Sequence, residues 1–101
     1  MRNDVIKLIY FNTRMGMYIC PSNKANVVAF LHGYEYGSDS DFKLTDEIKS
    51  LLINKYKIKE SNMGWPHQID TFSKKKSIEW MDAYLLISSE ILNSQLEPKN
   101  K

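Results

Sequence analysis

Few residues in this chain carry the chemistry of a nucleophilic active site, which needs a serine or cysteine, a histidine base and a group that orients that base. The only cysteine is Cys20, and the two histidines are His32 and His67. Cys20 precedes a proline in an apolar stretch, and neither histidine lies in a recognisable motif, so we interpret Cys20 as a structural thiol. The acidic side chains that could serve as an acid/base group are interpreted as a solvated helix face: Asp70, Glu79 and Asp82.

Metal and cofactor sites are poorly supported as well. One cysteine and two separated histidines do not supply the roughly four ligands of a zinc site. The segment Asp39-Ser40-Asp41 resembles the start of a calcium loop, but its sixth position is not glycine and Ser50 replaces the bidentate glutamate. Neither a Gly-x-Gly-x-x-Gly motif nor a phosphate loop occurs. We therefore expect no metal, no cofactor and no enzymatic activity.

Acidic residues concentrate in the stretch from Glu35 to Glu47. It contains five carboxylates and only one basic residue, Lys43. Aromatic side chains lie in and beside the same stretch, so it combines long-range attraction for a basic partner with contact area. We predict that a partner protein binds Tyr34, Glu35, Tyr36, Asp39, Asp41, Phe42, Asp46 and Glu47. The alternative is that these acids only cap helices and solvate a loop.

Basic residues concentrate elsewhere, at Lys55 to Lys59 and at Lys74 to Lys76, although the net charge is only +2. These lysines could contact phosphates if they converge. No helix-turn-helix motif and no interleaved exposed aromatics support that interpretation, so a solvated face is expected and nucleic acid is not the partner we favour. A small nucleic-acid-associated regulatory protein remains the alternative function.

Length and composition indicate one globular domain. The chain has 101 residues, of which 43% are hydrophobic and 12% aromatic, enough for a core but not for two domains. A single cysteine forms no internal disulfide, and no stretch approaches the roughly 20 apolar residues of a membrane span. The first residues lack the apolar core of an export signal, so a cytoplasmic location is expected. We predict a single helical domain at 1–96 and a frayed tail at 97–101.

Hydrophobic spacing predicts a mainly α fold of about four helices. The first covers about 4–12, capped by Asn3, with a β-strand as the rival because Val5 to Phe11 also favours strands. A short extended or turn segment is expected near 17–20. A second helix is capped by Ser22 and ends at Gly37, and a third covers about 42–56. Whether 67–72 is helical or extended stays open.

The last helix is predicted to cover about 74–94, with Ser73 as its N-cap. Its apolar positions occupy so much of the circumference that we expect this helix to be central in the bundle: Ile78, Met81, Tyr84, Leu85, Ile91 and Leu92, with Trp80 and Ile87. Phe30, Trp65 and Trp80 lie in apolar patterns and are expected in the core.

The order of several short motifs resembles a group of small bacterial immunity proteins. The motifs are Arg14-Met15-Gly16-Met17-Tyr18, Phe30-Leu31-x-Gly33-Tyr34, Gly64-Trp65 with Ile69, and a terminal apolar helix through Trp80-Met81 and Leu85 to Ile91. They extend over most of the chain, from about Arg14 to Ile91. Met15 stands where those proteins often have proline.

The resemblance implies an immunity protein of a contact-dependent growth inhibition or other polymorphic toxin system. Such proteins stay in the cytoplasm of the producing cell and bind one cognate toxin domain, commonly a nuclease. They block its active site or a surface that it needs. An acidic face would suit a nuclease, whose phosphate-binding surface is basic.

Overall fold

The first apolar segment forms a helix and not a strand. In the computed structural model, which describes residues 2–96, α1 spans Arg2–Thr13 and buries Val5, Leu8 and Phe11 at helical spacing. The elements that follow are η1 (Met15–Met17), α2 (Lys24–Tyr36), α3 (Leu44–Asn54), α4 (Trp65–Lys76) and α5 (Trp80–Leu96). The mainly α class is confirmed, with five α-helices over residues 2–96 instead of four; the expected tail at 97–101 lies outside the described residues.

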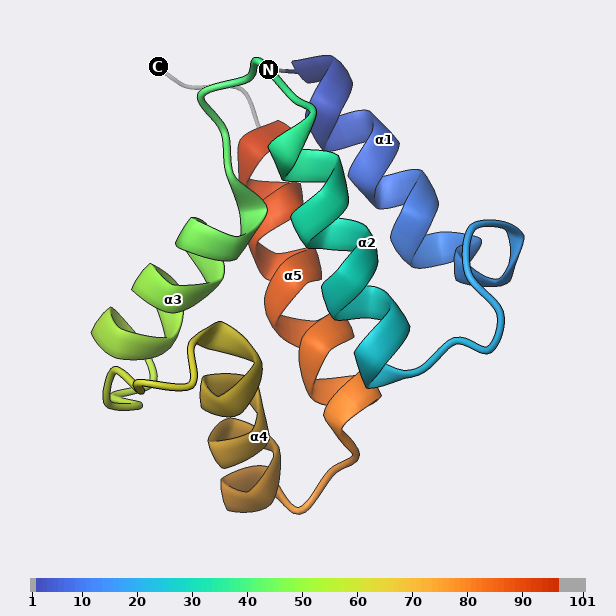
Figure 1. The fold of residues 1–101 in the computed structure, drawn as a ribbon. Helices are drawn as coiled ribbons and strands as arrows, with labels where there is room; N and C mark the ends of the chain where they lie inside the picture. The colour runs from blue at the N-terminus through green and yellow to red at the C-terminus, as the bar shows by residue number, and fades with distance from the viewer. Residues whose placement is uncertain (1, 97–101) are drawn as a thin grey trace.

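The central element is α5, as its broad apolar face predicts. It packs against α1, α3 and α4. In Figure 1, α2 lies in front of α5 and runs in the same general direction. The residues that α5 buries recur every three or four positions: Ala83, Tyr84, Ile87, Ser88, Ile91 and Leu92. The other helices therefore converge on one shared core.

Aromatic side chains pack α2 against α1. Phe30 stacks on Phe11 with ring centroids 4.0 Å apart and an interplanar angle of 6°. The predicted N-cap, Ser22, is wrong by one position: the side-chain oxygen of Asn23 accepts a hydrogen bond from the backbone N–H of Asn26 at 3.0 Å. An asparagine in this position performs the capping expected of the serine.

The predicted helix at 74–94 is wrong, because the chain reverses at Ser77. Residues 74–76 are the last turn of α4, and Ser73 is buried inside that helix instead of capping the next one. Ser77 adopts the left-handed conformation with φ 59°, and the N–H of Ile78 donates to the carbonyl of Ser73 at 3.0 Å. This is a Schellman-type helix end formed without the usual glycine, so no glycine or proline signals it.

The same segment resolves the open question at 67–72, which is part of α4. Pro66 lies in the first turn of that helix, where a proline needs no backbone donor. The indole N–H of Trp80, at the start of α5, donates to the carbonyl of Pro66 at 3.0 Å. This bond fixes the reversal between α4 and α5.

Of the two alternatives for the segment near 17–20, the turn is observed and the extended segment is wrong. Met15–Met17 form a 3-10 helix, and Tyr18 keeps helical backbone angles. The N–H groups of Tyr18 and Ile19 both donate to the carbonyl of Met15, at 2.9 and 3.0 Å. Met15 is buried at the end of α1, so local hydrogen bonds continue the helical path for one more turn.

A buried polar network joins α5 to α1. The hydroxyl of Tyr84 donates to the side-chain oxygen of Asn12 at 2.9 Å, and the amide of Asn12 donates to the hydroxyl of Ser88 at 2.9 Å. Ser88 in turn donates to the backbone carbonyl of Tyr84 at 2.7 Å. Burial raises the pKa of the Tyr84 hydroxyl, which therefore stays a donor at physiological pH.

Among residues 2–96, no helix combines the length and apolar content that crossing a membrane requires.

We predict that Ser77→Gly stabilises the protein by about 0.5–1 kcal/mol, because glycine adopts the left-handed conformation without a steric penalty. Urea unfolding measures the change. Ser50→Gly in the interior of α3 is the control and is expected to destabilise by a similar amount, about 0.5–1 kcal/mol. A loss of stability in Ser77→Gly would contradict this account of the reversal.

We predict that Tyr84→Phe destabilises the protein by about 1–2 kcal/mol, because it leaves the carbonyl oxygen of the Asn12 side chain without its donor. Thermal and urea unfolding check this. Tyr10→Phe on the exposed side of α1 is the control and is expected to change stability by less than about 0.5 kcal/mol. Equal effects of the two substitutions would mean that the network contributes nothing.

Candidate functional site

The loop between α2 and α3 is held by its own serines. The hydroxyl of Ser38 accepts a hydrogen bond from the N–H of Ser40 at 3.1 Å, and the hydroxyl of Ser40 accepts one from Phe42 at 3.1 Å. Phe42 is only 7% exposed and packs into the core at the end of the loop. The loop therefore presents its outward side chains from an anchored backbone.

Glu35 is committed to the fold. Its carboxylate accepts from the N–H of Thr45 at 3.0 Å and from the hydroxyl of Thr45 at 2.7 Å. Thr45 lies in the first turn of α3, whose N-cap residue, Lys43, makes no side-chain cap bond. Glu35 thus caps α3 from the last turn of α2. The amine of Lys43 donates a hydrogen bond to the backbone carbonyl of Glu35 at 3.2 Å.

Tyr34 is also occupied within the molecule. Its hydroxyl donates to the Asp4 carboxylate at 2.5 Å, which joins α2 to α1. The hydrogen bond from Tyr34, assisted by one with Ser40, lowers the pKa of Asp4. Burial, followed by the bond to Asp4, raises the pKa of Tyr34. This pair is therefore neutral tyrosine and ionised aspartate at physiological pH.

The remaining predicted residues face solvent. Tyr36 is 95% exposed, although it is a large aromatic side chain. The carboxylates beside it are exposed and form no ion pair among residues 2–96. We call the following set the acidic surface: Tyr36, Asp39, Asp41, Asp46 and Glu47. The eight predicted residues thus divide into three that support the fold and five that are available for a partner.

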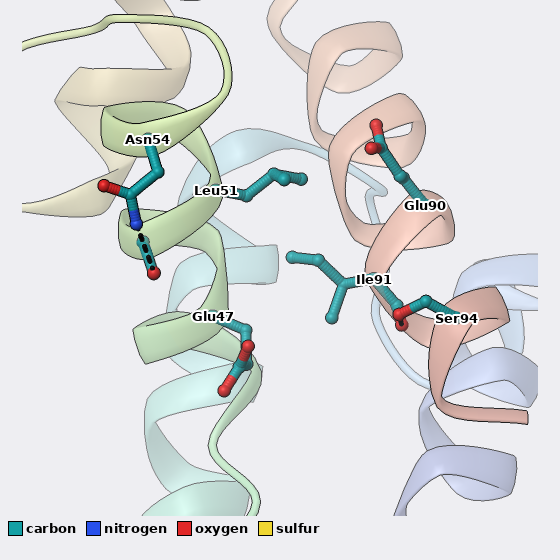
Figure 2. Close-up of a pocket in the computed structure, with 7 residues that line it drawn as sticks. Glu47, Leu51, Asn54, Glu90, Ile91 and Ser94 are labelled. Atoms are coloured by element: carbon teal, nitrogen blue, oxygen red, sulfur yellow. Dashed lines mark hydrogen bonds between the residues drawn. The ribbon is translucent and has the colours of Figure 1, made fainter. Parts of the chain in front are cut away.

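A groove of about 330 Å³ adjoins the acidic surface between α3 and α5 (Figure 2). Leu51 and Ile91 point toward one another across it, and Glu47 lies at one end. The rest of the lining is polar: Ser50, Asn54, Glu90 and Ser94. Glu47 therefore belongs both to the acidic surface and to the groove.

The two carboxylates of the groove differ in availability. Glu90 accepts hydrogen bonds from the amine of Lys55 and, at 2.8 Å, from the hydroxyl of Tyr56. These bonds, that from Lys55 first, lower the pKa of Glu90. Glu47 has no such partner in the described part of the chain. A cation entering the groove would therefore meet its free charge at the Glu47 end.

The side chains considered for nucleophilic chemistry lie on different elements. Cys20 is exposed in the connection between α1 and α2. His32, on α2, accepts a hydrogen bond from the indole N–H of Trp65 at 3.1 Å. His67, on α4, lines a separate hollow. Asp70 pairs with Lys74 at 3.3 Å.

The groove residues on α3 and α5 carry no signal in the sequence that marks them as a site. Leu51 and Ile91 belong to the apolar stripes of their helices, and such positions are predicted to be core. Ile91 is buried as that stripe predicts and Leu51 is half-buried, and only the packing of α3 beside α5 makes both of them line a groove. A polar residue flanking each apolar one, as Ser50 and Glu90 do, is too common on surface helices to reveal a groove.

Comparison of the chain with protein families, curated proteins and solved structures found no significant match. What the protein does must therefore be inferred from its own residues.

We predict that Tyr34→Phe destabilises the protein by about 1 kcal/mol at pH 7, because a partly exposed bond to a charged group is lost. The pKa of Asp4 is depressed in the folded state, so its contribution is present above the unfolded value of about 3.9 and disappears as pH falls through the lower folded value. The difference in unfolding free energy between the two proteins should shrink from pH 7 to pH 3.

Urea titrations at several pH values measure this difference. Tyr36→Phe is the matched control, because the exposed Tyr36 hydroxyl has no protein partner among residues 2–96. A difference between wild type and Tyr34→Phe that does not depend on pH would reject the coupling to Asp4.

Proposed function

We propose that this chain is a cytoplasmic immunity protein that binds a cognate toxin domain and neutralises it stoichiometrically. The observation that carries the proposal is Tyr36, a tyrosine 95% exposed beside carboxylates without ion pairs in the described part of the chain. Exposed tyrosines are favoured anchors of protein interfaces, because a large rigid ring fills a pocket at low entropic cost. The immunity assignment itself follows the resemblance in motif order.

The anchored loop favours tight binding through this surface. Ordering a mobile loop on association costs free energy, whereas Asp39 and Asp41 project from a backbone already held by Ser38 and Ser40. The acidic surface is therefore preorganised for a basic partner. A specific interface buries about 800 Å² per partner, which requires more area than this loop alone.

The groove between α3 and α5 supplies that additional area. Leu51 and Ile91 offer an apolar wall to the methylene stem of a lysine or arginine, and Glu47 offers its charge to the head group. The partner is therefore expected to present a basic segment that crosses α3. In a nuclease toxin such a segment would belong to the surface that holds the phosphate backbone, so binding would exclude the substrate.

The chain has a net charge of +2, so its complementarity to a basic toxin is local. Charges arranged in this way raise the association rate and select the partner more than they raise affinity. Neutralising them should slow association and leave dissociation nearly unchanged.

The triple variant Asp39→Asn, Asp41→Asn, Asp46→Asn tests this prediction. A toxin domain found in a neighbouring reading frame is to be co-expressed with each protein, and its association with the purified immunity protein is to be measured. We expect association to slow by about tenfold at low salt and protection of cells to fall accordingly.

The matched control is Glu60→Gln, Glu79→Gln, Asp82→Asn. It also removes three negative charges from exposed positions outside the acidic surface. Asp82, like Asp46, lies in the first turn of a helix. The two variants therefore lose similar helix-dipole stabilisation. Full protection by the first variant, or equal losses in both, would reject the acidic surface as the binding site.

A further inference from the structure

A second hollow, of about 350 Å³, lies between α4 and the connection that leaves α3. One wall is formed by His67, Thr71 and Lys75, which are four residues apart and so share one face of α4. The other wall is formed by residues 57–61. The hollow therefore follows α4 for about two turns.

The connecting segment is fixed against α4. Ile58 is only 4% exposed, and its N–H donates to the carbonyl of Leu52 at 2.8 Å. The side-chain amide of the buried Gln68 donates to the carbonyl of Lys59 at 3.3 Å. With its backbone anchored at these two points, the segment keeps Lys57 and Lys59 exposed on either side of Ile58.

The hollow is strongly basic. Residues 57–76 include five lysines and two carboxylates, and one of these, Asp70, is paired with Lys74. Glu60 lines the hollow, but the three lysines that line it form no ion pair among residues 2–96: Lys57, Lys59 and Lys75. The helix dipole explains lysines in the last turn of α4. The dipole of α4 does not explain Lys57 and Lys59, which the connecting segment places in the same hollow.

A smaller hollow of about 160 Å³ shares Ile58 and Lys75 with this basic hollow. Its lining includes Tyr56 and Phe72, whose rings meet edge to face with centroids 4.9 Å apart. The amine of Lys76 lies 5.9 Å from the centre of the Phe72 ring. Phe72 is buried and Tyr56 is half-buried, so Tyr56 supplies the aromatic surface beside these lysines. Cationic and aromatic surfaces together are the combination by which proteins bind phosphates and bases of single strands.

From this juxtaposition we infer that the chain has a nucleic-acid-binding site, separate from the acidic surface, that takes single-stranded RNA or DNA. Lys57, Lys59 and Lys75 neutralise successive phosphates, and His67 offers a further polar contact. A base packs at the mouth of the smaller hollow against Tyr56. This inference goes beyond the proposed immunity function and does not depend on it.

The test uses the purified full chain and a fluorescent twelve-nucleotide single strand of uridines, titrated at 50 to 200 mM NaCl. Three phosphate contacts predict a slope of log affinity against log salt of about −2, or roughly a 20-fold loss over that range. No binding at 50 mM salt would overturn the inference.

The decisive variant is Lys57→Gln, Lys59→Gln, Lys75→Gln, which should weaken binding by about tenfold or more at 50 mM salt and flatten the salt dependence. These side chains are exposed, so folding should be preserved, as circular dichroism verifies. The matched control is Lys7→Gln, Lys24→Gln, Lys49→Gln, which changes net charge equally at positions outside the hollow. Equal loss in both variants would mean attraction by net charge alone and would overturn the site.

Competition distinguishes the sources of the phosphate. Displacement of the strand by uridine monophosphate, but not by inorganic phosphate at the same concentration, supports recognition of phosphate and base together. Displacement by neither supports a polymer that spans several phosphates. Equal affinity for a duplex of the same length would overturn the role of the aromatic hollow, because paired bases are not free to pack against Tyr56.

Discussion

The burial of α5 is the constraint on which the rest of the structure depends. This helix packs against α1, α3 and α4, so its side chains fill the space that each of the others must cover (Figure 1). Tyr84 is fully buried there and still needs a partner for its hydroxyl, which Asn12 supplies. Apolar packing places α5 at the centre of the fold. The polar network between Tyr84 and Asn12 then determines how α1 lies against it.

The position of α3 follows from that constraint and determines what the surface offers. It packs on α4 and α5, and its N-terminus is capped by Glu35 from the end of α2. The cap and the buried Phe42 hold the intervening loop, so Asp39 and Asp41 are presented at a fixed place. Along this short stretch, residues that stabilise the fold alternate with residues exposed to solvent. Glu35 and Phe42 hold the backbone from which Tyr36 and the aspartates project.

Two surfaces of opposite charge lie at the two ends of α3. Carboxylates surround its N-terminal end, where they agree with the helix dipole, and lysines lie in the segment that follows its C-terminal end. Eleven residues of helix span about 16 Å, and the screening length at physiological salt is about 8 Å. The acidic surface and the basic hollow are thus screened from one another. One small protein has room for two independent electrostatic roles.

The sequence by itself determined what depends on neighbours along the chain. Helical spacing identified α2, α3 and the central role of α5, and composition placed carboxylates and lysines in separate stretches. The sequence also indicates Tyr36 and the nearby acids as candidate binding residues, because an aromatic residue among charged ones is recognisable from residue types alone. The apolar spacing of residues 4–12 also favours the helix that α1 forms over a strand.

Only the tertiary structure decided which of these residues are free. Glu35 and Tyr34 resemble surface residues in sequence, yet their partners, Thr45 and Asp4, are 10 and 30 positions away. The reversal at Ser77 lacks a glycine, and long-range packing of α4 against α5 selects it over a continuous helix. The groove beside Glu47 and the basic hollow beside Lys75 likewise exist only where separate elements meet. Hydrogen bonds and packing between distant residues have no periodic signature, and for that physical reason the sequence could not reveal them.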